Sequence, residues 1–140
     1  MYILDTNHIT VLGYSSPESF RLVQRLNDSG QDVVSTVITL EEQMRGWLAA
    51  INRTKDVFRQ MVAYERLNTR TQFLSKWLLL PWSSDAANLF VDLRKQGIRI
   101  GTADLKIASI TLVNDATLLS RNLRDFSKVP NLKIENWLDG

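Results

Sequence analysis

The chain has 140 residues, of which 44% are hydrophobic and 23% charged, and its formal net charge is +2. These values fit one globular domain of residues 1–140 and exclude a disordered or fibrous protein. The absence of cysteine excludes disulfides, thiolate nucleophiles and zinc–thiolate sites, and with a single histidine it leaves oxygen as the main type of metal ligand. We expect a cytoplasmic protein without membrane contact, because the apolar stretches are too short to span a bilayer and the start lacks the form of a signal peptide.

Predicted strands and helices alternate from the first residues. Tyr2–Leu4 is apolar without polar alternation, which is typical of a strand covered on both faces of a parallel sheet, and we expect it to be central. Further strands are predicted over residues 32–36, 116–120 and 132–135, and residues 78–82 fit a strand or a helix end equally well. Helices are predicted over residues 17–27, 39–51, 54–68, 83–96, 102–114 and 123–126, with Ser83 or Ser84 as the cap of the fourth and Thr102 as the cap of the fifth.

This alternation predicts a three-layer α/β fold with a mainly parallel central sheet flanked by helices. The helices over residues 39–51 and 54–68 follow each other without a strand between them. We therefore expect a helical hairpin beside the sheet.

Four acidic residues are placed near the ends of predicted strands. Asp5 follows the first strand, Glu42 follows the second, Asp104 opens the helix before the strand at 116–120, and Asp125 follows that strand. Because the carboxyl ends of parallel strands meet at one edge of a sheet, we expect these carboxylates to converge there. They would repel one another without a cation between them, and oxygen ligands favour Mg²⁺ or Mn²⁺.

Two of these acids have structural explanations at the start of a helix. Thr39 and Glu42 have the spacing of a capping box, and for Glu42 we weigh capping and catalysis equally. Asp104 lies two residues after Thr102, where the helix dipole favours any carboxylate. Taken alone, Asp104 is better explained by the dipole than by metal binding.

For the other two acids, the structural and the functional explanations differ in weight. A solvated surface role is the default for Asp125, which lies in a polar turn. Asp5 could cap the next helix, but a charge beside a buried strand end is costly without a partner. Thr6 and Asn7 either satisfy that helix start or orient water or a second carboxylate. We interpret His8 as a partly exposed helix residue without a catalytic role.

The basic residues gather in the middle of the chain, between Arg45 and Lys76. Such a surface could attract phosphate. A solvated helical surface explains any single one of these residues at least as well. The residues concerned are Arg45, Arg53, Lys55, Arg59, Arg66, Arg70 and Lys76.

Four segments resemble the motifs of a known family in the same order. They are LDTN at residues 4–7, ITLEEQMRG at 38–46, RIGTADLKIA at 99–108, and LLSRNLRDF at 118–126 followed by VPNLKIENW. With these segments the chain resembles PIN-domain ribonucleases, and more narrowly the VapC-type toxins of bacterial toxin–antitoxin pairs. The resemblance covers nearly the whole chain.

The resemblance implies a metal-dependent endoribonuclease. Asp5, Glu42 and Asp104 would hold one or two Mg²⁺ or Mn²⁺ ions, with the family's glutamate at Glu42 rather than Glu41. Family members place the last acid either at position 122 or at position 125. Because Asn122 is neutral, Asp125 is our choice for the fourth catalytic carboxylate. Thr6, Asn7, Ser120 and Asn122 are expected to orient the ligands and the water.

The resemblance also implies the partners. The substrate would be tRNA, ribosomal RNA or messenger RNA, with Arg45, Arg99 and Lys106 as candidate RNA contacts. A cognate antitoxin would lie across the groove near the acids, and a homodimer is expected. Apolar side chains of the hairpin could contact the antitoxin, although burial in the core is the preferred interpretation of each one singly: Trp47, Phe58, Met61, Tyr64, Phe73 and Trp77.

Two other functions remain as alternatives. A receiver-type signalling domain also sets acids around Mg²⁺, but it needs an aspartate at the end of its third strand and a lysine after its fifth. The strand at 116–120 is followed by Arg121 and Asn122, with no lysine until Lys128. A PIN-like module that binds RNA or a partner without cutting it is supported by the neutral Asn122, but such a module has no need to hold the other acids together.

Overall fold

The computed structural model describes residues 1–139, and its core is a five-stranded parallel sheet. The strands are β1 (Tyr2–Leu4), β2 (Val33–Thr36), β3 (Leu79–Leu80), β4 (Thr117–Leu119) and β5 (Lys133–Glu135), in the order β3-β2-β1-β4-β5. Every neighbouring pair is parallel. β1 is the central strand, as predicted, and residues 79–80 of the ambiguous segment form the edge strand β3.

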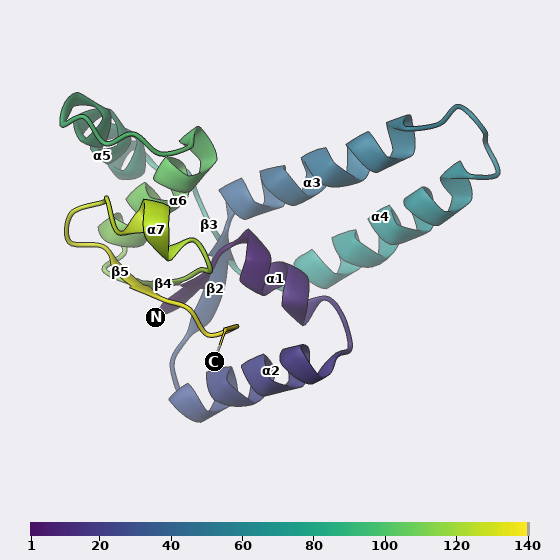
Figure 1. Ribbon diagram of the computed structural model, residues 1–140, viewed down its shortest axis with the longest axis horizontal. Helices are drawn as coiled ribbons and strands as arrows, with labels where there is room; N and C mark the ends of the chain where they lie inside the picture. Colours follow the sequence, from purple (N-terminus) through teal and green to yellow (C-terminus); the bar gives the residue numbers. More distant parts are fainter. Residues whose placement is uncertain (140) are drawn as a thin grey trace.

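Seven helices within residues 1–139 surround the sheet. They are α1 (Thr6–Leu12), α2 (Pro17–Ser29), α3 (Val37–Asn52), α4 (Gln60–Leu74), α5 (Ser84–Lys95), α6 (Thr102–Val113) and α7 (Leu123–Phe126). Figure 1 shows α5 and α6 on one side of the sheet and α1 and α2 on the other. The predicted three-layer α/β architecture is therefore confirmed. No helix in this part of the chain has both the length and the apolar character needed to cross a membrane.

The two faces of the sheet bury separate cores, because successive side chains of a strand point to opposite faces. Ile3 and Leu118 pack with residues of α5 and α6, such as Leu93 and Leu105. Leu4 and Leu119, one position further along the same strands, belong to the other core. That core also contains Ile9 of α1, Leu22 and Leu26 of α2, and Leu74 of α4. Burial on both faces explains why β1 is apolar at every position.

The helices α3 and α4 form the predicted hairpin, which projects away from the sheet (Figure 1). α4 begins at Gln60, so the prediction of a helix from residue 54 was wrong at its start. Residues 54–59 form a turn instead, because Thr54 Oγ1 accepts from the Asp56 N–H at 3.1 Å and Asp56 Oδ1 accepts from the Phe58 N–H at 2.9 Å. Side-chain to backbone bonds of this kind compete with helix formation.

The outer end of the hairpin is apolar and exposed. Phe58 is 78% exposed, Met61 64% and Tyr64 54%, so the interpretation of these three residues as core was wrong. Trp47, Phe73 and Trp77 are half-buried and pack against the core that contains Leu74. The helical period alone does not distinguish these two groups, because a projecting hairpin has no second layer to cover its apolar residues.

Candidate active site

Asp5 lies at the junction of β1 and α1, and its side chain caps the helix. The backbone N–H groups of Asn7 and His8 donate to Asp5 Oδ1 at 3.1 and 3.3 Å. With its amide nitrogen turned toward Asp5, the Asn7 side chain donates to both carboxylate oxygens, at 3.1 and 2.8 Å. Asp5 is only 6% exposed. These bonds satisfy the buried charge and hold it at the carboxyl end of the central strand.

Glu42 is free of a capping role. The cap of α3 is Thr36, whose Oγ1 accepts from the Thr39 N–H at 3.1 Å, so the capping-box interpretation of Thr39 and Glu42 was wrong. α3 begins earlier than predicted because Thr36, the last residue of β2, supplies the cap. Glu42 therefore lies in the second turn of α3, where its Oε1 accepts from Thr6 Oγ1 at 2.8 Å. This bond links α3 to the residue that follows Asp5.

Asn122 connects the other two acids. Its Nδ2 donates to Asp104 Oδ2 and to Asp125 Oδ2, both at 3.1 Å. Asp104 lies in the first turn of α6, and Asn122 caps the short helix α7, which contains Asp125. The cap of α6 is Gly101 rather than the predicted Thr102, and no side chain bonds there. Ser120 is fully buried at the end of β4, and its Oγ accepts from the Asn122 N–H at 2.9 Å.

The four predicted carboxylates share one electrostatic environment. Burial raises the pKa of Asp104 above its usual 3.8, and the negative charge of Glu42 raises it further. The hydrogen bond from Asn122 lowers it, while the charges of Asp5 and Asp125 add to the increase. Asp104 thus lies within reach of the other three charges, at the edge of the sheet where the strands end.

The residues fit a divalent cation by their chemistry. Carboxylate oxygens that destabilise one another's charge are the ligands that Mg²⁺ and Mn²⁺ prefer. Within residues 1–139, however, no three acidic or histidine side chains lie close enough together to form a ready-made metal site. The Asn122 amide lies between Asp104 and Asp125, where it partly offsets the repulsion that a cation would remove.

The chain is similar to known proteins over nearly its full length. No model of a known protein family matches it. Ribonuclease VapC2 of Rickettsia felis is 28% identical over 141 residues, which cover 98% of each chain. The tRNA(fMet)-specific endonuclease VapC of Salmonella typhimurium is 26% identical, with 97% of each chain covered. A crystal structure of VapBC2 from Rickettsia felis, bound to a DNA fragment from their promoter, matches with a TM-score of 0.72 at 26% identity, covering 97% of this chain and 98% of that chain.

In sequence and in fold the chain is similar to VapC-type PIN-domain proteins. The parallel sheet with flanking helices agrees with this family. The receiver-type alternative was wrong: β3 ends at Leu80 and is followed by Pro81 and Trp82, with no aspartate there.

Sequence reasoning missed one residue beside the acids of this chain. His8 is fully buried, so its interpretation as a partly exposed residue was wrong. Its Nε2 accepts from the Trp137 N–H at 3.3 Å, and its Nδ1 lies 3.4 Å from Asp5 Oδ1. His8 Nδ1 therefore lies beside Asp5 on the core side, buried and without a hydrogen bond. The spacing of three residues between Asp5 and His8 in a first helical turn is a signal that could have found this contact.

The three candidate RNA contacts belong to α3 and to α6 with the segment just before it. Arg45, on α3, pairs with Glu41 at 2.9 Å, and both side chains are exposed. Lys106 lies on α6 with its Nζ 5.6 Å from the centre of the Trp82 ring. Arg99 is exposed and lies just before α6. Each stays a prediction as an RNA contact.

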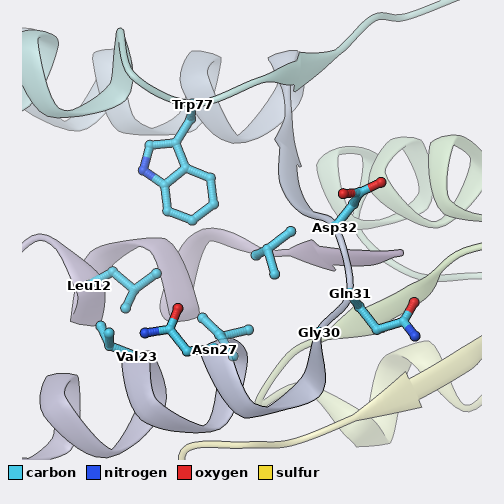
Figure 2. A pocket seen from close by; sticks show the side chains of 9 residues that line it. Leu12, Val23, Asn27, Gly30, Gln31, Asp32 and Trp77 are labelled. Atoms are coloured by element: carbon cyan, nitrogen blue, oxygen red, sulfur yellow. The ribbon is translucent and has the colours of Figure 1, made fainter.

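A cavity of about 430 Å³ lies near the amino end of β2, opposite to the end of the sheet at which the acids lie. Figure 2 shows Trp77 above this cavity, with Leu12, Val23 and Asn27 on the side of α1 and α2. Gln31 and Asp32, which precede β2, complete its wall. None of the four candidate carboxylates lines this cavity, which lies away from the carboxyl ends of the strands, where ligands bind in parallel sheets.

Proposed function

We propose that this VapC-type chain is an endoribonuclease toxin, which hydrolyses RNA phosphodiester bonds with Mg²⁺ or Mn²⁺ and is neutralised by a cognate antitoxin. The observation that carries the proposal is the Asn122 amide that joins Asp104 and Asp125, at a place where the charges of Glu42 and Asp5 also raise the pKa of Asp104. The names of the relatives support ribonuclease activity. The VapBC complex supports an antitoxin partner.

Asp5, Glu42 and Asp104 would hold the metal, directly or through water, and Asp125 would complete the site. Mg²⁺ or Mn²⁺, when bound, lowers the pKa of water and offsets the negative charge of the scissile phosphate. No protein nucleophile is needed, which suits a chain without cysteine.

The surrounding polar residues set the directions of the acids. Asn7 and the N-terminal amides of α1 hold the Asp5 carboxylate in one orientation. Thr6 holds one oxygen of Glu42, which leaves the other oxygen available to a ligand. Asn122, itself held by Ser120, donates from its Nδ2 to both Asp104 and Asp125, so that each carboxylate lies 3.1 Å from the same nitrogen. This arrangement preorganises the charges, so that little reorganisation is needed when the substrate arrives.

The substrate class follows from the relatives and the basic surface. We propose RNA, and tRNA is the first class to test because one relative is named a tRNA(fMet)-specific endonuclease. Ribosomal and messenger RNA are the other classes. We propose that the protein acts on RNA in the cytoplasm.

Exposed apolar side chains support the proposal that the chain binds protein partners. We propose that the antitoxin covers part of the hairpin, where Phe58, Met61 and Tyr64 are exposed. We also propose a homodimer, for which the exposed Val37, Met44 and Leu48 on α3 offer an apolar surface.

Cleavage of labelled total RNA by the purified protein tests the activity. Asp5→Asn keeps a capping oxygen at α1 but removes the charge, so we expect it to abolish cleavage while the thermal melt stays nearly unchanged. Wild-type protein should give discrete products with Mg²⁺ or Mn²⁺ and none with a chelator. Full cleavage by the Asp5→Asn variant would contradict this mechanism.

A second function is favoured by one observation. Asn122 places a neutral amide between Asp104 and Asp125, which a module that binds RNA without cutting it would tolerate. Intact RNA together with tight, metal-dependent binding in the same experiment would select this function.

A further inference from the structure

A second charged region lies away from the acids, between the end of α1 and the hairpin. A cavity of about 310 Å³ is lined there by four arginines and two aromatic residues, which are Arg53, Arg59, Arg66, Arg70, Tyr14 and Trp47. An adjoining hollow shares Tyr14, Arg66 and Arg70 with this cavity. We call these two hollows together the arginine cavity.

The arginine cavity is short of negative charge. Within residues 1–139, Arg53, Arg66 and Arg70 have no carboxylate at ion-pair distance. Arg59 has a partner in Asp56 at 3.8 Å, and both side chains are exposed, so that pair contributes little. Glu65 is the one acid among the residues lining the two hollows. With Asp56 counted beside Glu65, four arginines are accompanied by two acids, and this excess of positive charge gives the cavity a positive potential, which attracts anions.

Arg70 is held in place within the cavity. Its guanidinium carbon lies 3.8 Å from the centre of the Tyr14 ring. Gly13 makes this position possible, because a Cβ atom built on Gly13 would overlap Arg70 Nη1. The Arg70 side chain is thus fixed before any ligand binds, which reduces the entropy lost on binding.

A line of polar contacts runs from the acids to the arginine cavity along α1 and α3. Thr6 bonds to Glu42 at the first turn of α1, and Gln43 Nε2 donates to Thr10 Oγ1 at 3.0 Å one turn later. Gly13 and Tyr14 follow directly at the end of α1. The helix Thr6–Leu12 spans about 10 Å, the length of roughly three steps of a stacked nucleic-acid strand.

We propose that the arginine cavity binds backbone phosphates of the RNA substrate, about three nucleotides from the bond that the acids cleave. This inference rests on the proposed function. Arginine forks match phosphate oxygens in pairs, and Tyr14, 58% exposed, offers a ring of the kind on which unpaired bases stack. The aromatic walls and the continuous polar line to the acids favour RNA over an acidic peptide.

Binding of fluorescein-labelled single-stranded RNA tests this inference without any cleavage. The background is Asp5→Asn with a chelator, and a 12-nucleotide RNA is compared with a dinucleotide. We compare Arg66→Gln/Arg70→Gln with Arg21→Gln/Lys95→Gln, which removes the same charge from exposed positions of α2 and α5. The first variant should bind the 12-mer roughly tenfold more weakly than the control at about 0.1 M salt, and its salt slope should fall by about 1.4, or 0.7 for each lost phosphate contact.

Gly13→Ala is a variant that preserves charge. The backbone φ of −75° at Gly13 suits alanine, so the fold should hold, but the new Cβ displaces Arg70 from its position on Tyr14. We expect it to weaken binding of the 12-mer by less than the double arginine variant does. Its melting temperature should not fall.

Three results would overturn the inference. The first is equal binding of the 12-mer by the arginine variant and its control. The second is an equal loss for the dinucleotide, which is too short to reach from the acids to the cavity. The third is a poly-glutamate peptide of the same charge binding the cavity more tightly than the 12-mer does. Failure of the proposed function would instead be seen as absence of cleavage by the wild-type protein.

Discussion

Asp104 is the acid whose charge is most opposed by its surroundings. Burial and the charge of Glu42 raise its pKa above 3.8, so the folded protein holds the Asp104 proton more tightly than the unfolded chain does. Stability must then fall as pH rises from 3.8 through the raised pKa, and the loss is complete above that pKa. The ionised Asp104 therefore destabilises the metal-free protein at neutral pH.

Asp104→Asn should raise the melting temperature of the metal-free protein at neutral pH. The amide has nearly the same shape, keeps an oxygen for the Asn122 bond and carries no charge. The gain should shrink as pH falls and vanish near pH 3.8. Thermal melts with a chelator between pH 4 and 8 measure it, with the exposed Asp92→Asn of α5 as the control. A lower melting temperature than that of wild type at pH 7 would contradict the placement of Asp104 among the other acids.

At the scale of the element, α6 carries Asp104 on a helix start without a side-chain cap. Its cap, Gly101, has φ −54° and ψ 149°, which other residues also adopt. A Cβ atom at Gly101 would meet no atom within 4 Å. A capping side chain should therefore fit there.

Gly101→Ser should stabilise the protein by roughly 0.5–1 kcal/mol. Serine restricts the unfolded chain and gives an oxygen to the free N–H groups of α6. Gly101→Ala restricts the chain without capping, so it should stabilise less. Urea denaturation of the three proteins measures the difference in the free energy of unfolding. A serine variant less stable than the alanine variant would show that no cap bond forms at this position.

The elements were predictable to the extent that local patterns decide them. The apolar strand at Tyr2–Leu4 and the cap Ser83 of α5 follow from short-range preferences, and both were found as expected. The start of α4 was not predicted correctly, because the turn bonds of Thr54 and Asp56 replace helix bonds over six residues. The cap of α3 was misplaced because Thr36 and Thr39 both have the residue type for that role.

At the scale of the whole molecule, the sheet separates two cores and the hairpin extends beyond both. Leu74, near the end of α4, is 3% exposed and belongs to one core. Phe58 and Met61, at the other end of the hairpin, contact neither core. Similar apolar residues on one hairpin should thus differ greatly in their contribution to stability.

Phe58→Ser/Met61→Ser should change the free energy of unfolding by less than about 0.5 kcal/mol. Leu74→Ala, in contrast, should cost about 2–5 kcal/mol, because it removes buried methyl groups and leaves a cavity. Guanidinium denaturation of both variants tests this. A large loss from the double serine variant would mean that the hairpin end is covered in solution, for instance by a second copy of the chain.

The site was predictable where it depends on topology and not where it depends on packing. The order of strands and acids was enough to expect Asp5, Glu42 and Asp104 at one edge of the sheet. Contacts between residues far apart in the sequence could not be predicted in this way, and the bond from Trp137 to the buried His8 is an example. The amide of Asn122 between Asp104 and Asp125 likewise depends on how α7 packs beside α6.

Calorimetric titration of Mn²⁺ tests the carboxylate cluster most directly. We compare the wild-type protein with Asp5→Asn/Asp104→Asn and with Asp28→Asn/Asp92→Asn, a control that removes two exposed charges from α2 and α5. Mn²⁺ should bind to the wild type and to the control with the same affinity and should not bind to the first variant. Equal binding by all three proteins would place the metal elsewhere and contradict a metal-dependent site at the edge of the sheet.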